Sequence, residues 1–105
     1  MAEPDKKTLK QLEALDVSRE TIGRLTIYAE LLIKWNARIN LISPKTVGDL
    51  WQRHIIDSLQ LLPHLPGTGP IADIGSGAGF PGLMLAVAGV EDVHLIESDQ
   101  RKCAF

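Results

Sequence analysis

The sequence predicts an α/β protein in which a helical segment is followed by a β-α-β unit. Apolar residues recur every three or four positions through the first part of the chain, which is the period of amphipathic helices. Two short apolar runs come later, Ile71–Ile74 and Val93–Ile96, on either side of a stretch long enough for a helix. This order is that of two parallel strands joined by a crossover helix. We place the boundary between the two parts after residue 66, so that they comprise residues 1–66 and 67–105.

Each of the first two helices is marked by an apolar stripe. The stripe of the first helix consists of Leu9, Leu12 and Leu15. Ser18 precedes the second helix and has the side chain of an N-cap. The stripe of this second helix runs from Ile22 to Ile39, so the helix is expected to end near Asn40.

A third helix is expected between Thr46, which can cap it, and Pro63, which ends it. Two polar residues, His54 and Asp57, interrupt its apolar surface and flank each other at helical spacing. We interpret them first as a structural hydrogen-bonded pair, because buried polar groups normally find such partners. The alternative is that they form the wall of a substrate site. Asn40 leaves the same choice open, between capping a helix and contacting a ligand or substrate.

A glycine-rich loop follows the first predicted strand directly. Its glycines at 75, 77 and 79 allow the backbone to turn sharply and to approach a ligand closely. Pro81 suits the first position of the helix that follows. Glu97 ends the second strand about 20 residues later, where a β-α-β unit places a carboxylate beside a ribose diol. The loop therefore predicts a nucleoside-containing cofactor.

Two classes of cofactor compete for this loop. A dinucleotide fingerprint fits the glycines at 77, 79 and 82, so the pattern alone does not exclude NAD. The register argues against it, because the apolar strand stops at Ile74 and the turn must begin at Gly75. The pattern Asp73-x-Gly75-x-Gly77-x-Gly79 starts at the end of the strand and uses every glycine before the helix. It resembles the first motif of S-adenosylmethionine-dependent methyltransferases with a Rossmann-like fold.

Net charge, cysteine content and hydropathy narrow the expected partners and the expected compartment of the protein. The net charge of −2 gives no basic footprint for nucleic acid over the whole chain. A single cysteine, Cys103, excludes an internal disulfide and fits a reducing compartment. No apolar run has the length of a membrane span. We therefore expect a cytoplasmic protein with no membrane partner and no metal site.

Four blocks of residues together resemble the bacterial small-subunit ribosomal RNA guanine-N7 methyltransferases, the glucose-inhibited division protein B family. They are Trp35-Asn36-x-x-x-Asn40-Leu41, Arg53-His54-x-x-Asp57-Ser58, the loop Asp73–Gly82, and Leu95-Ile96-Glu97 with Lys102. The resemblance extends from about residue 20 to the end of the chain. It implies the start of a Rossmann-like class I methyltransferase domain, truncated after its second strand.

The same resemblance implies the cofactor, the reaction and the site. The cofactor would be S-adenosylmethionine, and the substrate would be N7 of a guanine in 16S ribosomal RNA. Gly75 and Phe80 would line the cofactor site, Gly77 and Gly79 would shape the same loop behind Asp73, and Glu97 would accept the ribose hydroxyls. The substrate-side candidates are Asn40, His54 and Asp57.

No catalytic residue is assigned within residues 1–105. S-adenosylmethionine is already an activated methyl donor and guanine N7 carries an exposed lone pair, so the protein has to position rather than activate. The implied partner is small-subunit ribosomal RNA or the assembling subunit, and we expect the full-length protein to be a monomer. A non-catalytic nucleotide-binding or interaction module stays open as an alternative.

Overall fold

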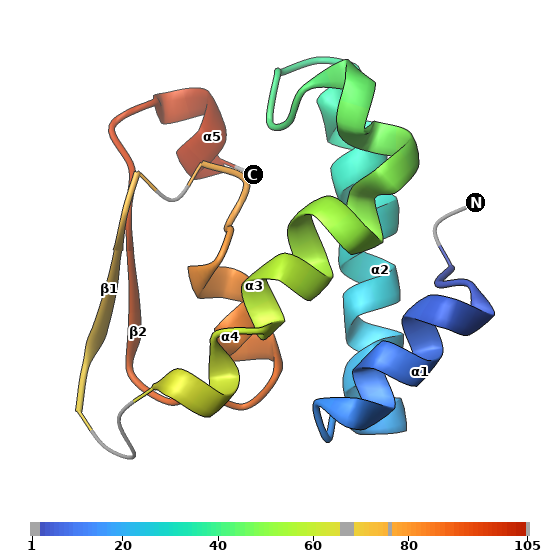
Figure 1. The fold of residues 1–105 in the computed structure, drawn as a ribbon. Helices are drawn as coiled ribbons and strands as arrows, with labels where there is room; N and C mark the ends of the chain where they lie inside the picture. Colours follow the sequence, from blue (N-terminus) through green and yellow to red (C-terminus); the bar gives the residue numbers. More distant parts are fainter. Residues whose placement is uncertain (1–2, 66–68, 76, 105) are drawn as a thin grey trace.

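The computed structural model describes residues 3–65, 69–75 and 77–104 (Figure 1). A helical segment precedes a β-α-β unit, which confirms this part of the predicted fold class. The elements are α1 (Lys6–Ala14), α2 (Arg19–Asn36), a 3-10 helix (Pro44–Asp49), a π-helix (Trp51–Ile56), α3 (Asp57–Leu59), a 3-10 turn (Leu62–His64), β1 (Ile71–Ile74), α4 (Gly82–Val87), β2 (Val93–Ile96) and α5 (Gln100–Ala104). The two strands are parallel and have the bounds that the apolar runs indicated. The boundary expected after residue 66 lies outside the described residues.

The first two helices begin at side-chain caps. The Asp5 carboxylate accepts a hydrogen bond from the Thr8 N–H at 2.8 Å and caps α1. The Ser18 hydroxyl accepts from the Thr21 N–H at 3.1 Å and caps α2, as predicted. The expected stripe of α1 is partly wrong, because Leu9 is 38 % exposed whereas Leu12 is fully buried.

Helix α2 ends earlier than its apolar stripe indicates. Its last residue is Asn36, and the side-chain Oδ1 of Asn36 accepts hydrogen bonds from the N–H groups of Leu41 and Ile42 at 2.9 and 3.0 Å. These two bonds turn the chain back against the helix end. Asn40 therefore caps no helix, and the prediction of a helix that ends near Asn40 is wrong.

The third predicted helix is present but is built differently. Ser43, rather than Thr46, is its N-cap, because Pro44 occupies the first turn and the Ser43 hydroxyl accepts from the Lys45 N–H at 3.3 Å. The Thr46 hydroxyl instead donates to the Ser43 carbonyl at 2.9 Å. The chain then winds as a π-helix before it continues as α3, and Pro63 lies beyond α3 in a separate 3-10 turn.

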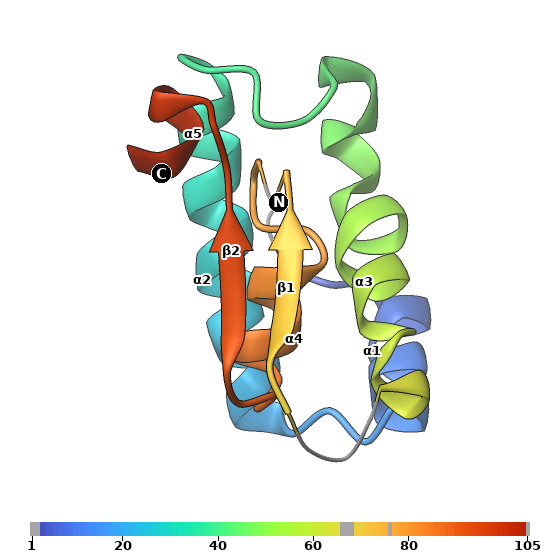
Figure 2. The same ribbon diagram turned by 90° about the vertical axis from the view of Figure 1, so that its left-hand side faces the viewer.

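The helical segment and the β-α-β unit share one cluster of buried apolar side chains among the described residues. Leu25, Leu32, Ile55 and Leu59 contribute from the helices, and Met84 contributes from α4. Figure 2 shows α4 behind the two strands, on the side where the helical segment lies. The opposite face of the strands is open, and Ile74 on it is 81 % exposed.

Candidate functional site

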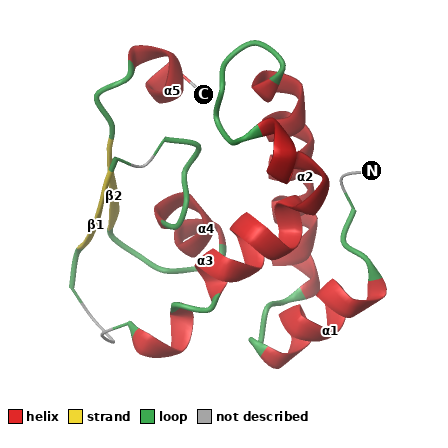
Figure 3. Cartoon of the chain, turned by 45° about the horizontal axis from the view of Figure 1, so that its top comes forward, coloured by secondary structure: helices red, strands yellow, loops and turns green. Residues whose placement is uncertain are grey.

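The carboxyl ends of both strands lie at the same end of the molecule, next to the loop between β1 and α4 and next to α5 (Figure 3). A cavity of about 250 Å³ opens there. It is lined by Gly77, Ala78, Gly79, Leu83, Leu95, Glu97, Lys102 and Cys103. Crevices at the carboxyl ends of parallel strands are the usual ligand sites of open α/β sheets. We call this cavity the strand-end cavity.

The glycines of the loop are needed for its path. Gly75, Gly77 and Gly79 all have positive φ angles, of 74°, 52° and 99°. At Gly79 a Cβ would also lie only 2.7 Å from the Cβ of Leu83, so a larger residue would push the loop away from α4. The sequence-based prediction that these glycines form a sharp turn after β1 is confirmed.

Asp73 joins β1 to the start of α4. Its Oδ2 accepts a hydrogen bond from the Gly82 N–H at 3.0 Å. A Cβ on Gly82 would overlap Leu95 of β2 and would lie 2.8 Å from the Cβ of Asp73. Helix α4 therefore packs directly on the strands at this point, and Pro81 precedes its first residue instead of being that residue.

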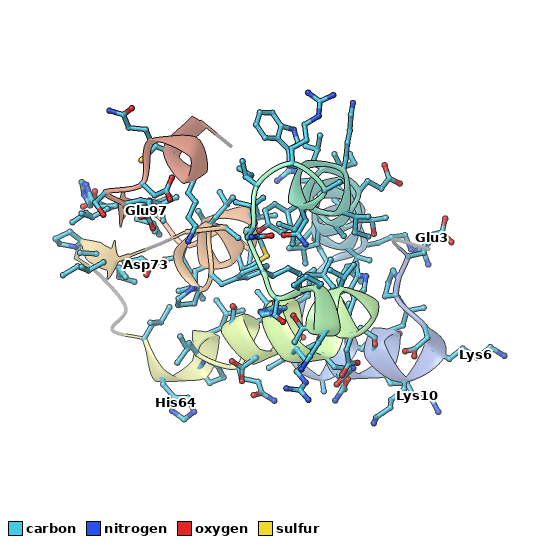
Figure 4. All side chains as sticks on the ribbon, turned by 90° about the horizontal axis from the view of Figure 1, so that it is seen from above. Glu3, Lys6, Lys10, His64, Asp73 and Glu97 are labelled. Carbon is cyan, nitrogen blue, oxygen red and sulfur yellow. The ribbon has the colours of Figure 1, made fainter. Side chains whose placement is uncertain are left out.

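Glu97 closes the strand-end cavity from the side of β2. Its Oε1 accepts a hydrogen bond from the Gly77 N–H at 2.7 Å, and its Oε2 accepts one from the Asp99 N–H at 2.9 Å. These bonds, that from Asp99 first, hold the pKa of the carboxyl below its usual range. The carboxylate is therefore ionised near neutral pH and is fixed beside the loop. Figure 4, a view from above, places Glu97 near Asp73 at the strand side of the molecule.

The strand-end cavity offers the groups that a nucleoside needs. Leu83 and Leu95 supply apolar walls for a base, and each Glu97 oxygen keeps a further lone pair that can accept from a hydroxyl. The volume is below the roughly 300–1,000 Å³ of sites that enclose a whole drug-sized ligand. The described residues therefore fit a nucleoside part better than an entire cofactor.

A second cavity, of about 370 Å³, lies at the other end of the same loop. It is lined by Arg53, His54, Asp57, Ser58, Gln60, Leu61, Phe80 and Pro81. We call it the helix-side cavity, since most of its residues come from the π-helix and the residues after it. The structure thus places Phe80 on this cavity, whereas the neighbouring glycines line the strand-end cavity.

Three aromatic rings hold the loop against the helices. The Phe80 ring stacks on the imidazole of His54, with ring centroids 5.1 Å apart and an angle of 27° between the planes. The Tyr28 ring meets Phe80 edge to face at 5.6 Å, and the Tyr28 hydroxyl donates to the Ala78 carbonyl. Burial raises the pKa of Tyr28, so its hydroxyl stays protonated and remains a donor.

The predicted hydrogen bond between His54 and Asp57 is wrong for the described residues. The Nε2 atom of His54 instead lies 3.0 Å from the hydroxyl of Thr46. The π-helix from Trp51 to Ile56 is the physical reason, because its wider turn changes which side chains share a face. Burial lowers the pKa of His54, and the charge of nearby Asp57 only partly opposes this. Asn40 is exposed and lines neither cavity.

Sequence reasoning missed several residues of the two cavities. Leu95 and Lys102 belong to a motif block but were not predicted to line the site, and Leu83 and Cys103 belong to no motif. On the helix side, Arg53 adjoins the predicted residues, and its guanidinium lies 3.6 Å from Asp49 in an exposed ion pair.

In the part of the chain that the structure describes, no helix is long and apolar enough to cross a membrane.

A glycine loop and an acidic residue at the carboxyl ends of two parallel strands define the ligand-site class of open α/β proteins. Comparison with known families makes the identification more specific. The family model described as rRNA small subunit methyltransferase G (GidB) matches residues 21–105. The chain therefore belongs to this family.

Curated relatives agree with the family model. The chain is 64 % identical over 90 residues to ribosomal RNA small subunit methyltransferase G of Paramagnetospirillum magneticum, covering 85 % of this chain and 44 % of the relative. It is 60 % identical over 89 residues to the protein of that name from Gluconobacter oxydans, covering 85 % and 46 %. For the Rickettsia akari protein of that name the identity is 53 % over 92 residues, covering 87 % and 48 %. The chain thus spans just under half the length of these relatives.

Proposed function

We propose that this chain supplies the S-adenosylmethionine-binding part of a cytoplasmic methyltransferase that modifies N7 of a guanine in small-subunit ribosomal RNA. The observation that carries the proposal is the hydrogen bond from the Gly77 N–H to Glu97, which fixes a carboxylate across the glycine loop at the ends of both strands. Membership of the rRNA small subunit methyltransferase G family supports the reaction class. Ribosomal RNA, or the assembling small subunit, would be the partner.

In this proposal the residues of the chain bind and orient. Glu97 would accept the ribose hydroxyls, and Leu83 and Leu95 would contact the adenine. Gly75, Gly77 and Gly79 would let the loop backbone approach the cofactor, and Asp73 would hold the loop by its bond to Gly82. The sulfonium of S-adenosylmethionine supplies an already activated methyl group, so catalysis would rest on proximity and orientation.

A second candidate is dinucleotide binding, which one observation favours. Gly82 packs helix α4 directly on Asp73 and Leu95, and this is the role of the third glycine in a dinucleotide fingerprint. Packing at Gly82 alone therefore does not separate NAD from S-adenosylmethionine. The family favours the methyl donor, and so does the register, since β1 ends at Ile74 and the turn begins at Gly75.

Calorimetric titration of the chain with S-adenosylmethionine and with NAD separates the two candidates. We expect S-adenosylmethionine to bind and NAD to give no heat of binding. The reverse result would overturn the proposed cofactor. If S-adenosylmethionine binds but the full-length protein transfers no methyl group to ribosomal RNA, the non-catalytic binding module is the correct alternative.

The role of Glu97 has its own test. Glu97→Ala should weaken adenosine by about 1.5–3 kcal/mol, the range for a hydrogen bond to a charged group. It should leave the affinity for 2′,3′-dideoxyadenosine unchanged, because that ligand lacks both hydroxyls. Glu91→Ala removes an exposed carboxylate that lines neither cavity and serves as the control. Equal losses for the two ligands would show that Glu97 only shapes the loop.

A further inference from the structure

The helix-side cavity has no assigned ligand, yet it borders the same loop as the strand-end cavity. Gly77–Gly79 line the strand-end cavity, and the next two residues, Phe80 and Pro81, line the helix-side cavity. A molecule in one cavity is therefore separated from a molecule in the other by a single stretch of loop. The volume of about 370 Å³ lies within the range of small-ligand clefts and cavities.

The lining combines flat apolar surface with polar groups. Phe80, stacked on His54, supplies aromatic surface, and Leu61 adds an apolar side chain that is 41 % exposed. Arg53, Asp57 and Gln60 supply a guanidinium, a carboxylate and an amide. Proteins recognise unpaired RNA bases with this combination, in which a ring face stacks and polar side chains read the base edges.

Asp57 is the group in this cavity that can select one base. Among the described residues, no side chain and no backbone N–H donates a hydrogen bond to the Asp57 carboxylate. Both of its oxygens can therefore accept hydrogen bonds from a ligand. Guanine presents two adjacent donors, N1–H and the N2 amino group, on its Watson–Crick edge. Adenine, cytosine and uracil do not present such a pair. A carboxylate accepts both donors at once and so favours guanine.

We infer that the helix-side cavity binds an unpaired guanine of the RNA substrate, with Asp57 accepting hydrogen bonds from N1–H and N2 of the base. The inference rests on the proposed function and adds the place and the recognition of the substrate. The N7 atom lies on the opposite edge of the purine from N1, so this contact leaves N7 free. Arg53 can serve the adjoining phosphate, because its ion pair with Asp49 is exposed and so of little strength.

His54 fits this site as a neutral aromatic wall. Burial lowers its pKa, so the imidazole is uncharged at neutral pH. Its Nε2 is already engaged with Thr46, which fixes the ring under Phe80. The positive charge at the cavity therefore comes from Arg53, whereas His54 contributes ring surface.

The test titrates the isotope-labelled chain with GMP and AMP while its backbone amide signals are followed by NMR. The two ligands share a phosphate and a ribose, so a difference between them reports on the base. We expect GMP to shift the signals of residues 53–61 and of Phe80. Measured from these signals, GMP should bind roughly tenfold more tightly than AMP, which corresponds to about 1.4 kcal/mol. Equal affinities at these residues, or GMP shifts confined to other residues, would overturn the inference.

Two variants test whether Asp57 recognises the base. Asp57→Asn replaces one acceptor by a donor and should lower GMP affinity roughly tenfold while leaving AMP unchanged. Glu30→Gln removes an exposed acidic charge on α2, outside the cavity, and should change neither ligand. Unfolding curves of both variants verify the fold, since Asp57 is exposed and its replacement should cost little stability. Unchanged GMP binding by Asp57→Asn would show that Asp57 does not read the base.

A parallel titration with S-adenosylmethionine keeps this inference separate from the proposed function. Its expected signals are those of Gly77, Glu97 and Lys102. If S-adenosylmethionine shifts these signals and GMP shifts none in the helix-side cavity, the guanine site is refuted and the proposed function stands. If GMP shifts its expected signals and S-adenosylmethionine shifts none, the proposed function is refuted while the base site is retained.

Discussion

Gly82→Ala is the substitution for which the structure makes the most specific statement about stability. The added methyl group would overlap the end of the Leu95 side chain and would lie 2.8 Å from Cβ and 2.9 Å from Oδ2 of Asp73. Leu95 can turn aside, because it is 44 % exposed. The Cβ of Asp73 cannot, because it is attached to the backbone of β1. Helix α4 would therefore have to move away from the strand.

The expected cost has two parts. Overpacking of this kind destabilises by about 1–3 kcal/mol. The shift also stretches the 3.0 Å hydrogen bond between the Gly82 N–H and Asp73, and bonds to charged groups contribute about 1.5–3 kcal/mol. Since the two are not additive, we expect roughly 2–4 kcal/mol in the free energy of unfolding. For a domain of this size that lowers the melting temperature by at least about 8 °C.

Urea unfolding followed by circular dichroism measures the loss. Gly23→Ala is the matched control, because Gly23 lies in α2 and a Cβ there would meet nothing within 4 Å. This control should stabilise by about 0.5–1 kcal/mol, since alanine favours a helix over glycine. If Gly82→Ala is as stable as the unchanged chain, the close packing of α4 on β1 is wrong.

Three further predictions follow from individual contacts. Gly77→Val should abolish S-adenosylmethionine binding, because Gly77 has a φ of 52° that a β-branched residue adopts only under strain; unchanged affinity by calorimetry would refute the loop assignment. Tyr28→Phe should cost about 1–3 kcal/mol in urea unfolding, because it leaves the Ala78 carbonyl without its partner, and an unaltered midpoint would contradict this. Burial lowers the pKa of folded His54, so the unfolded chain binds that proton first and stability should fall as the pH drops through about 6.5. Melting curves against pH should lose part of this slope in His54→Gln, and a slope identical to that of the unchanged chain would count against the role of His54.

Local patterns were sufficient for much of the fold. The two strands were predicted with their observed bounds, because each is a short apolar run that ends at a loop or an acidic residue. Ser18 was a reliable helix start, since its hydroxyl needs only a neighbouring N–H three residues on. Features of this kind depend on residues that are close in sequence.

The wrong predictions concern side-chain contacts, which the spacing of apolar residues in the sequence does not reveal. The stripe of α2 continues to Ile39, yet the helix stops at Asn36, because the side chain of Asn36 accepts two backbone N–H groups from the following turn. The π-helix between Trp51 and Ile56 has the same apolar spacing as an α-helix, so the sequence placed His54 beside Asp57. The extra width of that turn directs His54 toward Thr46 and Phe80 instead.

The candidate site likewise has residues that the sequence predicted and residues that only the packing brings into place. Spacing alone located the glycine loop and Glu97, and the structure joins them by a hydrogen bond. The apolar walls, Leu83 and Leu95, are ordinary core-forming residues in the sequence and gain their place only through the packing of α4 on the strands. The helix-side cavity likewise needs the contact between Phe80 and the π-helix.

The position of the bound cofactor tests the central claim most directly. Intermolecular nuclear Overhauser effects between the ribose and adenine protons of S-adenosylmethionine and the labelled chain report which cavity it occupies. We predict effects to the methyl groups of Leu83 and Leu95 and to the amide of Gly77, all of which line the strand-end cavity. Effects to Leu61 or Phe80 alone, or no effects at saturating S-adenosylmethionine, would contradict the account.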